Sequence, residues 1–230
     1  LGDGDLALHV ERTRRLAQGE TLSAITRDIG ARLGIDVQIV PMSDDPVRTR
    51  VRTQGGWIDF QDYFVRRRCE PVVQEITFAG AADAKPQPEV LAALADPSLR
   101  AVVICPSNPL ISIEPILSIK AIREALKRCA APVVAVSPII GGEAVKGPTA
   151  KMLRELGIGP SAASVARRYG DLIDGYIIDN DDSAEAKDIA VHVAVTRTLM
   201  KTLDDRKDLA RVALETADAI KASSLAQSEA

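Results

Sequence analysis

Two stretches decide the fold: AVVICPSNPLISIEPIL at residues 101–117 and PVVAVSPIIGGEAVKGPTAKML at residues 132–153. Each begins with a short apolar run typical of a strand, breaks into a loop of Pro, Ser, Asn or Gly, and continues into a helix-like pattern. In an open parallel sheet, ligands bind at the carboxyl ends of the strands. Two loops of matching design therefore predict one shared crevice, rich in small donors and backbone N–H groups, that suits a phosphorylated ligand.

The surrounding segments predict an α/β fold, a Rossmann-like parallel sheet flanked by helices. The expected strands lie at 101–105, 133–137, 173–178 and 191–195, and the expected helices at 88–96, 113–128, 148–156, 161–169 and 204–220. Strands that alternate with helices of this length favour a parallel sheet covered on both faces. The polar tail, residues 221–230, is expected to fray.

The first third of the chain has a different pattern. Helices are expected over 5–17 and 21–33, a strand over 37–40, and β structure over 47–79 with a turn at Gln54-Gly55-Gly56. Because no helices separate these last strands, the region is expected to be antiparallel. We therefore expect one domain over 1–230, in which residues 1–80 form a helical and antiparallel β excursion that covers the site and residues 81–220 form the Rossmann-like core.

The composition of the chain argues against several classes of function and location. The net charge of -3 and the aromatic content of 3% give no general attraction to nucleic acid and few stacking platforms for it. No stretch has the roughly twenty apolar residues of a membrane span, and no secretory signal is visible. The three cysteines lack metal-type spacing, and Cys105 is expected to be buried in a reducing cytosol. The sequence therefore predicts a cytoplasmic protein with no nucleic-acid or membrane partner.

The loops after the two apolar runs carry the candidate binding residues. Ser107 and Asn108, set between two prolines, suit a phosphate or a ribose hydroxyl, or they simply cap the next helix. Ser112 is either a cap or a phosphate contact. Gly141 and Gly142 can form an anion-binding nest or a plain turn. Lys146-Gly147-Pro148-Thr149, at a helix start, is another place for a phosphate.

Acidic residues and one histidine complete the candidates. Asp44 and Asp45 follow a strand candidate and suit Mg²⁺, which takes one or two carboxylates together with substrate phosphates. Asp3 and Asp5 fit the same role or cap a helix. A third cluster, at 179–182, is better explained by solvated loops. His9 could act as a base, a ligand contact or a core residue.

Five motifs in order carry a resemblance to a known family. They are LGDGDLALH at 1–9, PMSDDPVRT at 41–49, Phe60-Gln61 with YFVR at 63–66, PSNP at 106–109 and SPIIGG at 137–142. Together they make the chain, from residue 1 to about 215, resemble the 2-phospho-L-lactate transferase family of coenzyme F-420 biosynthesis.

The resemblance implies a Rossmann-like fold, a homodimer and a Mg²⁺-dependent transfer. A phospholactyl, phosphoenolpyruvyl or phosphoglyceryl group would move from a guanosine diphosphate donor to the deazaflavin Fo, with release of GMP. Asp44 or Asp45 would bind the metal and accept the proton of the attacking hydroxyl. The substrate-binding residues implied are Asp3, Asp5, His9, Phe60, Gln61, Arg66, Ser107, Asn108, Pro109, Ser112, Ser137, Pro138, Gly141 and Gly142.

Two points of the resemblance leave alternatives open. The family's opening glycine-rich segment would precede Leu1 and is not in this chain, and it is expected to supply further phosphate contacts and a metal carboxylate. The related gluconeogenesis-factor family shares the pattern at Ser112 to Leu117, which suggests a non-catalytic nucleotide or nucleotide-sugar sensor. That family has a Pro-Gly-Ser loop in place of Pro-Ser-Asn-Pro. A third interpretation treats all these loops as scaffold.

Overall fold

The core of the protein is a four-stranded parallel sheet. The computed structural model describes residues 2–144 and 147–228. Strands β4 (Val102–Ile104), β5 (Val133–Val136), β8 (Gly175–Asp179) and β9 (His192–Thr196) lie in the order β4-β5-β8-β9, all parallel. The predicted α/β fold class is confirmed. All four carboxyl ends lie on one edge, so the loops that leave them are neighbours.

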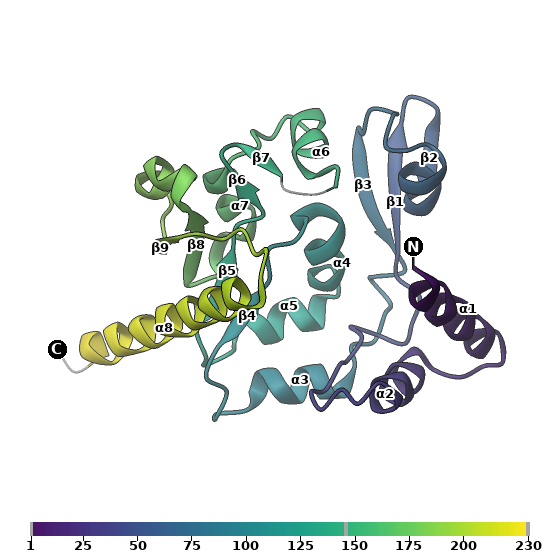
Figure 1. Cartoon of the computed structure of the whole chain (residues 1–230), viewed down its shortest axis with the longest axis horizontal. Helices are drawn as coiled ribbons and strands as arrows, with labels where there is room; N and C mark the ends of the chain where they lie inside the picture. Colours follow the sequence, from purple (N-terminus) through teal and green to yellow (C-terminus); the bar gives the residue numbers. More distant parts are fainter. Residues whose placement is uncertain (1, 145–146, 229–230) are drawn as a thin grey trace.

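Helices cover both faces of this sheet. Val134 and Val136 of β5 pack on one face beneath α8 (Leu203–Ser228), while Val133 and Ala135 pack on the other with residues of α6 (Thr149–Glu155) and α7 (Ala162–Tyr169). This alternation follows from the period of two along a strand. Figure 1 shows α8 crossing the sheet as one long helix. The apolar run of β5 is therefore buried on both sides.

The excursion precedes the core. It comprises α1 (Asp3–Ala17), α2 (Leu22–Arg32) and an antiparallel sheet in the order β2-β1-β3, formed by β1 (Arg48–Thr53), β2 (Gly56–Asp59) and β3 (Glu75–Ala79). A π-helical turn, η1 (Asp62–Arg66), follows β2. Buried side chains of this region share one apolar cluster with the parallel-sheet core, among them Val51, Tyr63 and Val73. In Figure 1 the antiparallel sheet faces α4 and α6.

The helices between the strands are shorter than the sequence predicts. The expected helix 113–128 is instead the π-helical η2 (Pro109–Ile113), α4 (Glu114–Leu117) and α5 (Lys120–Lys127), after α3 (Pro88–Ala95) and β4. The break falls at Ile119, whose backbone is extended and whose side chain is buried in a small cluster with Ala84 and Ile122. Burial of Ile119 thus accounts for the interruption.

Three other expectations are wrong. Residues 37–40 form no strand; Val37 and Ile39 are 72% and 50% exposed, and no described strand pairs with the segment. Cys105 is exposed, because β4 ends one residue before it. The tail does not fray at residue 221, since α8 continues to Ser228.

The connections at the carboxyl edge are compact. After β5 comes the hairpin β6 (Ile139–Ile140) and β7 (Glu143–Ala144), and after α7 a short 3₁₀ turn, η3 (Gly170–Leu172), leads into β8. Another 3₁₀ segment, η4 (Asn180–Asp188), links β8 to β9. No helix in the described part of the chain has the length and apolar character needed to cross a membrane.

Candidate functional site

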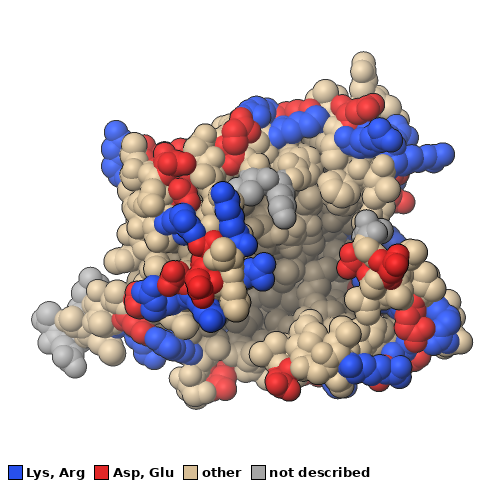
Figure 2. Space-filling view, viewed as in Figure 1, with Lys and Arg blue, Asp and Glu red and all other residues tan. Residues whose placement is uncertain are grey.

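A cavity of about 530 Å³ opens at the carboxyl edge of the parallel sheet. Its lining comes from three loops of the core and from the excursion: Phe60, Phe64, Pro106, Ser107, Asn108, Ile111, Ser112, Ser137, Pro138, Ile140, Gly147, Pro148, Thr149, Thr198, Leu199 and Met200. None of these residues carries a charge, and Figure 2 shows a central hollow with mainly neutral walls and charged side chains around its rim. The volume is that of a small-molecule site.

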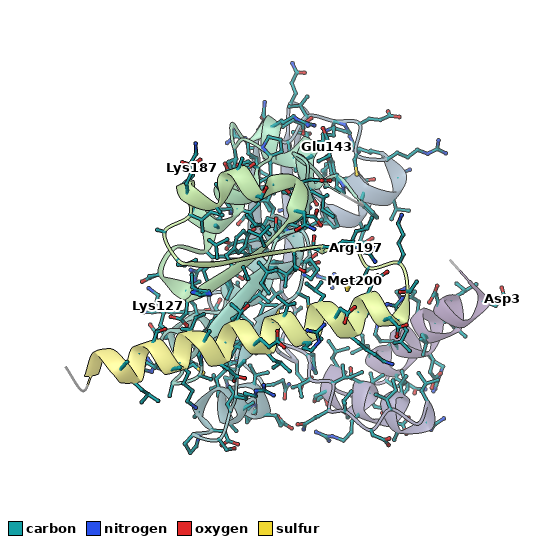
Figure 3. The ribbon with its side chains drawn as sticks, turned by 60° about the vertical axis from the view of Figure 1, so that its left-hand side comes forward. Asp3, Lys127, Glu143, Lys187, Arg197 and Met200 are labelled. Atoms are coloured by element: carbon teal, nitrogen blue, oxygen red, sulfur yellow. The ribbon has the colours of Figure 1, made fainter. Side chains whose placement is uncertain are left out.

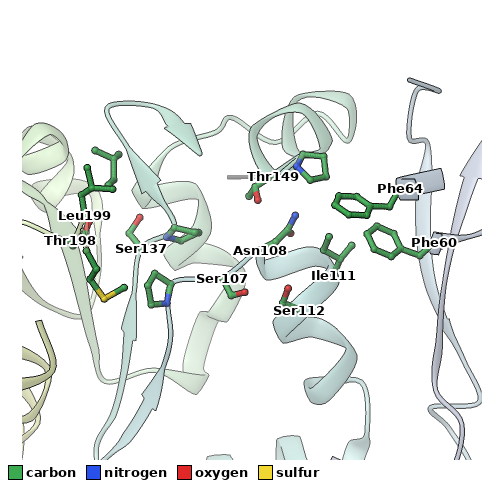
Figure 4. Close-up of a pocket in the computed structure, with 16 residues that line it drawn as sticks. Phe60, Phe64, Ser107, Asn108, Ile111, Ser112, Ser137, Thr149, Thr198 and Leu199 are labelled. Carbon is green, nitrogen blue, oxygen red and sulfur yellow. The ribbon is translucent and has the colours of Figure 1, made fainter. Parts of the chain in front are cut away.

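The loop after β4 forms the floor of the cavity. Asn108 caps η2, because its Oδ1 accepts the backbone N–H of Leu110 at 2.9 Å. The capping and binding interpretations of Asn108 are compatible, because its Nδ2 donates one N–H to the sulfur of Met152 at 4.0 Å and keeps a second N–H. The hydroxyls of Ser107 and Ser112 have no hydrogen-bond partner among the described residues, and both side chains line the cavity. Figure 4 shows Ser107 and Asn108 between the two ends of the site.

The loop after β5 contributes in a different way from the one predicted. Ser137 and Pro138 line the cavity, but Gly141 and Gly142 do not. These glycines form the turn of the β6–β7 hairpin, with φ of 59° and 75°. Such positive values at both central positions are those of a Gly-Gly hairpin turn. Gly141 and Gly142 therefore serve as the turn of the hairpin and not as part of the cavity lining.

The N–H groups of this turn already bind an anion, which is a side chain of the protein. Gly141 N–H donates to Asp182 Oδ2 at 3.1 Å, and Gly142 N–H donates to Oδ1 at 3.3 Å. Asp182 is buried, and burial raises its pKa above the ordinary value more than these N–H groups lower it. The nest predicted for a phosphate therefore holds a carboxylate.

Asp179 binds Thr198, which lines the cavity after β9, on the side opposite the β6–β7 hairpin. Its Oδ2 accepts the N–H of Thr198 at 2.7 Å and the Thr198 hydroxyl at 2.9 Å, while Oδ1 accepts the N–H of Asp181 at 3.2 Å. Burial raises the pKa of Asp179, but these hydrogen bonds outweigh it, and the pKa lies below the ordinary value. The expectation of solvated acidic side chains at 179–182 is wrong for Asp179 and Asp182, which are 5% and 4% exposed.

An aromatic pair from the excursion closes the other end of the cavity. Phe60 and Phe64 stack with their ring centroids 5.5 Å apart and their planes at 19°. Phe64 is 43% exposed and lines the cavity, so part of its side chain is open to a ligand. Figure 4 places this pair at one end of the cavity and Thr198 with Leu199 at the other. The arrangement offers a flat apolar surface to a planar ring.

The residues predicted from the first motif lie elsewhere. Asp3 is in the exposed first turn of α1, and Figure 3 shows it well away from Met200 of the cavity. Asp5 accepts the N–H of Gly2 at 3.2 Å and so caps α1. His9 is exposed, and its Nδ1 lies 2.9 Å from a guanidinium nitrogen of Arg12. None of these side chains lines the cavity.

Asp44 and Asp45 are both hydrogen bonded within the protein, and their metal-binding role stays a prediction. Asp44 accepts both the N–H and the hydroxyl of Ser23, at 2.7 and 2.8 Å, and Asp45 Oδ2 accepts the N–H of Lys85 at 2.8 Å. Burial raises the Asp44 pKa, but hydrogen bonds from Ser23 and Gln87 bring it below the ordinary value. Neither carboxylate lines the cavity, and the described residues include no group of three His, Cys, Asp or Glu side chains able to hold a metal ion.

The remaining predicted residues do not line the cavity. Pro109 is buried at the start of η2. Gln61 is exposed beside the aromatic pair, and Arg66 is exposed with its guanidinium 3.8 Å from Asp62. Lys146, suggested for a phosphate, lies outside the described residues.

Several lining residues escaped the sequence prediction. Thr198, Leu199 and Met200 follow β9 and reach the cavity because β9 lies beside β8 at the edge of the sheet. Their only local signal is their position directly after a strand. Phe64 belongs to a quoted motif without being predicted as a site residue. In contrast, Gly147, Pro148 and Thr149 belong to the stretch predicted for a phosphate, and they line the cavity.

Comparisons with known proteins first define the class of fold. Solved structures of a UPF0052 protein from Bacillus halodurans align with TM-scores of 0.62 and 0.64 at 15% and 14% identity, over 92% of this chain and 71% of the other. At that identity the likeness concerns the fold alone. The protein is thus an α/β protein of this fold, with its cavity at the carboxyl edge of the parallel sheet.

The sequence places it more narrowly. The family model of the 2-phospho-L-lactate transferase CofD matches residues 1–219, and the chain belongs to this family of transferases. A phosphoenolpyruvate transferase from Streptomyces griseus is 39% identical, over 96% of this chain and 72% of the relative. The 2-phospho-L-lactate transferases of Methanocaldococcus jannaschii and Haloarcula marismortui are 38% and 41% identical, over 94% of this chain and 69% and 62% of those proteins. These matches favour the transferase over the sensor alternative.

Proposed function

We propose that this protein transfers a 2-phospholactate-type group, phospholactyl, phosphoenolpyruvyl or phosphoglyceryl, from a guanosine diphosphate donor to the deazaflavin Fo, in coenzyme F-420 biosynthesis. The observation that carries the proposal is the meeting of the loops after β4 and β5 in one cavity that has hydroxyl and amide donors in its middle and an aromatic pair at one end. Family membership supports the reaction class.

In this reaction the terminal ribityl hydroxyl of Fo attacks the phosphorus that bears the organic acid. A new P–O bond forms, the bond to the bridging oxygen of the diphosphate breaks, and GMP departs with that oxygen while the hydroxyl proton passes to solvent. Phosphoryl transfer of this kind depends on placement and on donors for the growing negative charge. Neutral donors that line the cavity can serve both needs.

The two ends of the cavity suit the two substrates. The Ser107 hydroxyl, the Asn108 amide and the Thr149 side chain provide donors for the diphosphate and ribose of the guanosine donor. Phe60 and Phe64 provide the surface on which the deazaflavin ring stacks. The acceptor then enters from the side of the excursion and meets the donor above the β4 loop.

The test of the reaction is the mass of the product. Full-length protein is incubated with Fo, Mg²⁺ and each of the three candidate donors in turn, and the product is analysed by mass spectrometry. A product heavier than Fo by one phospho-acid group, formed together with GMP, supports the proposal and identifies the acid. If the protein binds nucleotide but converts no donor, the result contradicts the proposal and favours the sensor alternative.

The aromatic assignment has its own variant. Phe64→Leu keeps an apolar side chain but removes the stack, and we expect the KM for Fo to rise about two- to tenfold with the KM for the donor unchanged. Val65→Ala is the matched control, because Val65 lies in the same turn, is 66% exposed and does not line the cavity. An unchanged KM for Fo in Phe64→Leu would show that the ring binds elsewhere.

Three further properties stay predictions. Mg²⁺ dependence, a homodimer and a cytoplasmic location are expected from the family likeness. Asp44 and Asp45 are engaged by Ser23 and Lys85, so the donor phosphates would supply most of the ligands of the ion. Titration of donor and Mg²⁺ by calorimetry, together with light scattering of the protein, measures the first two.

A further inference from the structure

Two buried carboxylates stand at the carboxyl end of β8, between the two strands whose loops form opposite walls of the cavity. Strand β8 pairs with β5 on one side and with β9 on the other. Asp182 reaches toward the β5 side and binds the turn of the β6–β7 hairpin, which contains Ile140 of the cavity lining. Asp179 reaches toward the β9 side and binds Thr198, another lining residue.

Burying these anions is costly unless they are well hydrogen bonded. Asp179 and Asp182 are 5% and 4% exposed, and neither has a Lys, Arg or His ion-pair partner among the described residues. Their donors from the two walls are the N–H groups of Gly141, Gly142 and Thr198 and the Thr198 hydroxyl, and the Asp181 N–H adds a local bond to Asp179. An uncompensated buried charge would be expelled or neutralised, so the loops must keep this conformation for the carboxylates to stay ionised.

Resting on the proposed function, we infer that Asp179 and Asp182 are positioning residues, which hold the Thr198 wall and the Ile139–Ala144 hairpin at the separation that a nucleotide diphosphate requires. They touch no reacting atom. Their role is to remove loop motion before the donor binds, so that the donor does not lose affinity in ordering the loops.

The variants are Asp182→Asn and Asp179→Asn. An asparagine offers one oxygen where the aspartate offers two, so in Asp182→Asn one of the two glycine N–H groups loses its acceptor. The matched control is Asp181→Asn, because Asp181 lies between the two in sequence, carries the same charge, is exposed, and its carboxylate bonds to no described residue. Loss of one hydrogen bond to a charged group corresponds to about tenfold weaker binding of GDP, measured by calorimetry.

Two measurements separate positioning from a general structural role. Hydrogen–deuterium exchange of the segment 139–144 should accelerate in Asp182→Asn, and that of 196–200 in Asp179→Asn, with no change in Asp181→Asn. In turnover assays the KM for the donor should rise while the KM for Fo stays the same. A merely destabilised enzyme would instead lose active protein and lower the apparent kcat, with both KM values unchanged.

The outcomes are distinct. Wild-type exchange rates at 139–144 in Asp182→Asn and at 196–200 in Asp179→Asn, or GDP affinities equal to that of Asp181→Asn, would overturn the inference. If the wild-type protein itself binds no GDP, the proposed function fails, and the exchange experiment alone then decides whether the carboxylates hold the loops.

Discussion

Glu155, on α6, joins the parallel-sheet core to the excursion, and its replacement is the most informative stability experiment. Its Oε2 accepts the N–H of Val73 at 3.0 Å, and its Oε1 pairs with Lys151, whose Nζ also donates to the carbonyl of Pro71 at 3.1 Å. Val73 is fully buried, and the Glu155 side chain is 16% exposed. The side chain thus satisfies a buried backbone donor that has no other acceptor among the described residues.

The expected cost of Glu155→Ala combines two effects. An unsatisfied buried N–H costs about 1–3 kcal/mol, and loss of a partly exposed ion pair adds about 0–1 kcal/mol, so a loss of about 1–4 kcal/mol of unfolding free energy is expected. Glu155→Gln keeps an acceptor for Val73 and loses only the charge, so its cost should stay below about 1 kcal/mol. The difference between the two variants isolates the buried hydrogen bond.

Urea denaturation followed by two probes measures both values. Circular dichroism reports the whole molecule, and fluorescence of Trp57, the single tryptophan, reports the antiparallel sheet of the excursion. At this chain length each kcal/mol lowers the Tm by about 2–4 °C, so Glu155→Ala is also visible in thermal melts. Equal losses for the alanine and glutamine variants, or a loss under about 0.5 kcal/mol for alanine, would refute the reasoning.

Two further predictions concern the backbone and the buried carboxylates. A Cβ at Gly80, where φ is 87°, would lie 2.4 Å from the carbonyl oxygen of Pro46, so Gly80→Ala should strongly destabilise the protein. The control is Gly157→Ala, whose Cβ meets no atom within 4 Å and whose expected cost is about 1 kcal/mol. The urea midpoints of the two variants should show the larger loss of stability for Gly80→Ala. The pKa of Asp179 is lowered, so its stabilisation is present at neutral pH and is lost as the pH falls through that pKa. Asp182, which faces Glu185 and Asp179, has a raised pKa, so its ionised form costs stability at neutral pH and the cost disappears as the pH falls through the raised pKa. The Tm of the wild type should therefore exceed that of Asp179→Asn by less as the pH falls. Relative to Asp182→Asn, the Tm of the wild type should rise as the pH falls. Tm curves that run parallel for the wild type and both variants would contradict both predictions.

The pKa of Asp179 is lowered and that of Asp182 is raised, so only Asp182 loses stability in its ionised form. This loss of stability fits a residue that serves function. Asp182 holds a turn of two glycines with only two N–H donors, whereas Asp179 has three donors, one of them the Thr198 hydroxyl. The hydrogen bonds to Asp182 do not offset its burial and the nearby charges of Glu185 and Asp179, whereas the hydrogen bonds to Asp179 outweigh its burial. We therefore expect Asp182→Asn to weaken binding more than it weakens the fold.

The sequence by itself determined the architecture and one half of the site. The apolar run at Val133–Val136 has to be covered on both faces, and this requires a parallel sheet with helices on either side. The loops at Ser107-Asn108 and Ser137-Pro138 follow directly from strand ends, so their meeting in one cavity could be predicted from local pattern. These inferences need only the period of a strand and the polarity of parallel strands.

Tertiary structure alone decided the rest, because long-range partners select among locally equivalent roles. Gly141 and Gly142 could serve a phosphate or a turn, and Asp182, forty residues further along the chain, binds their N–H groups. Asp44 accepts two hydrogen bonds from Ser23, a contact across 21 residues that no local pattern predicts. Thr198 reaches the cavity only because β9 lies beside β8, and strand order is set by packing that no short segment encodes.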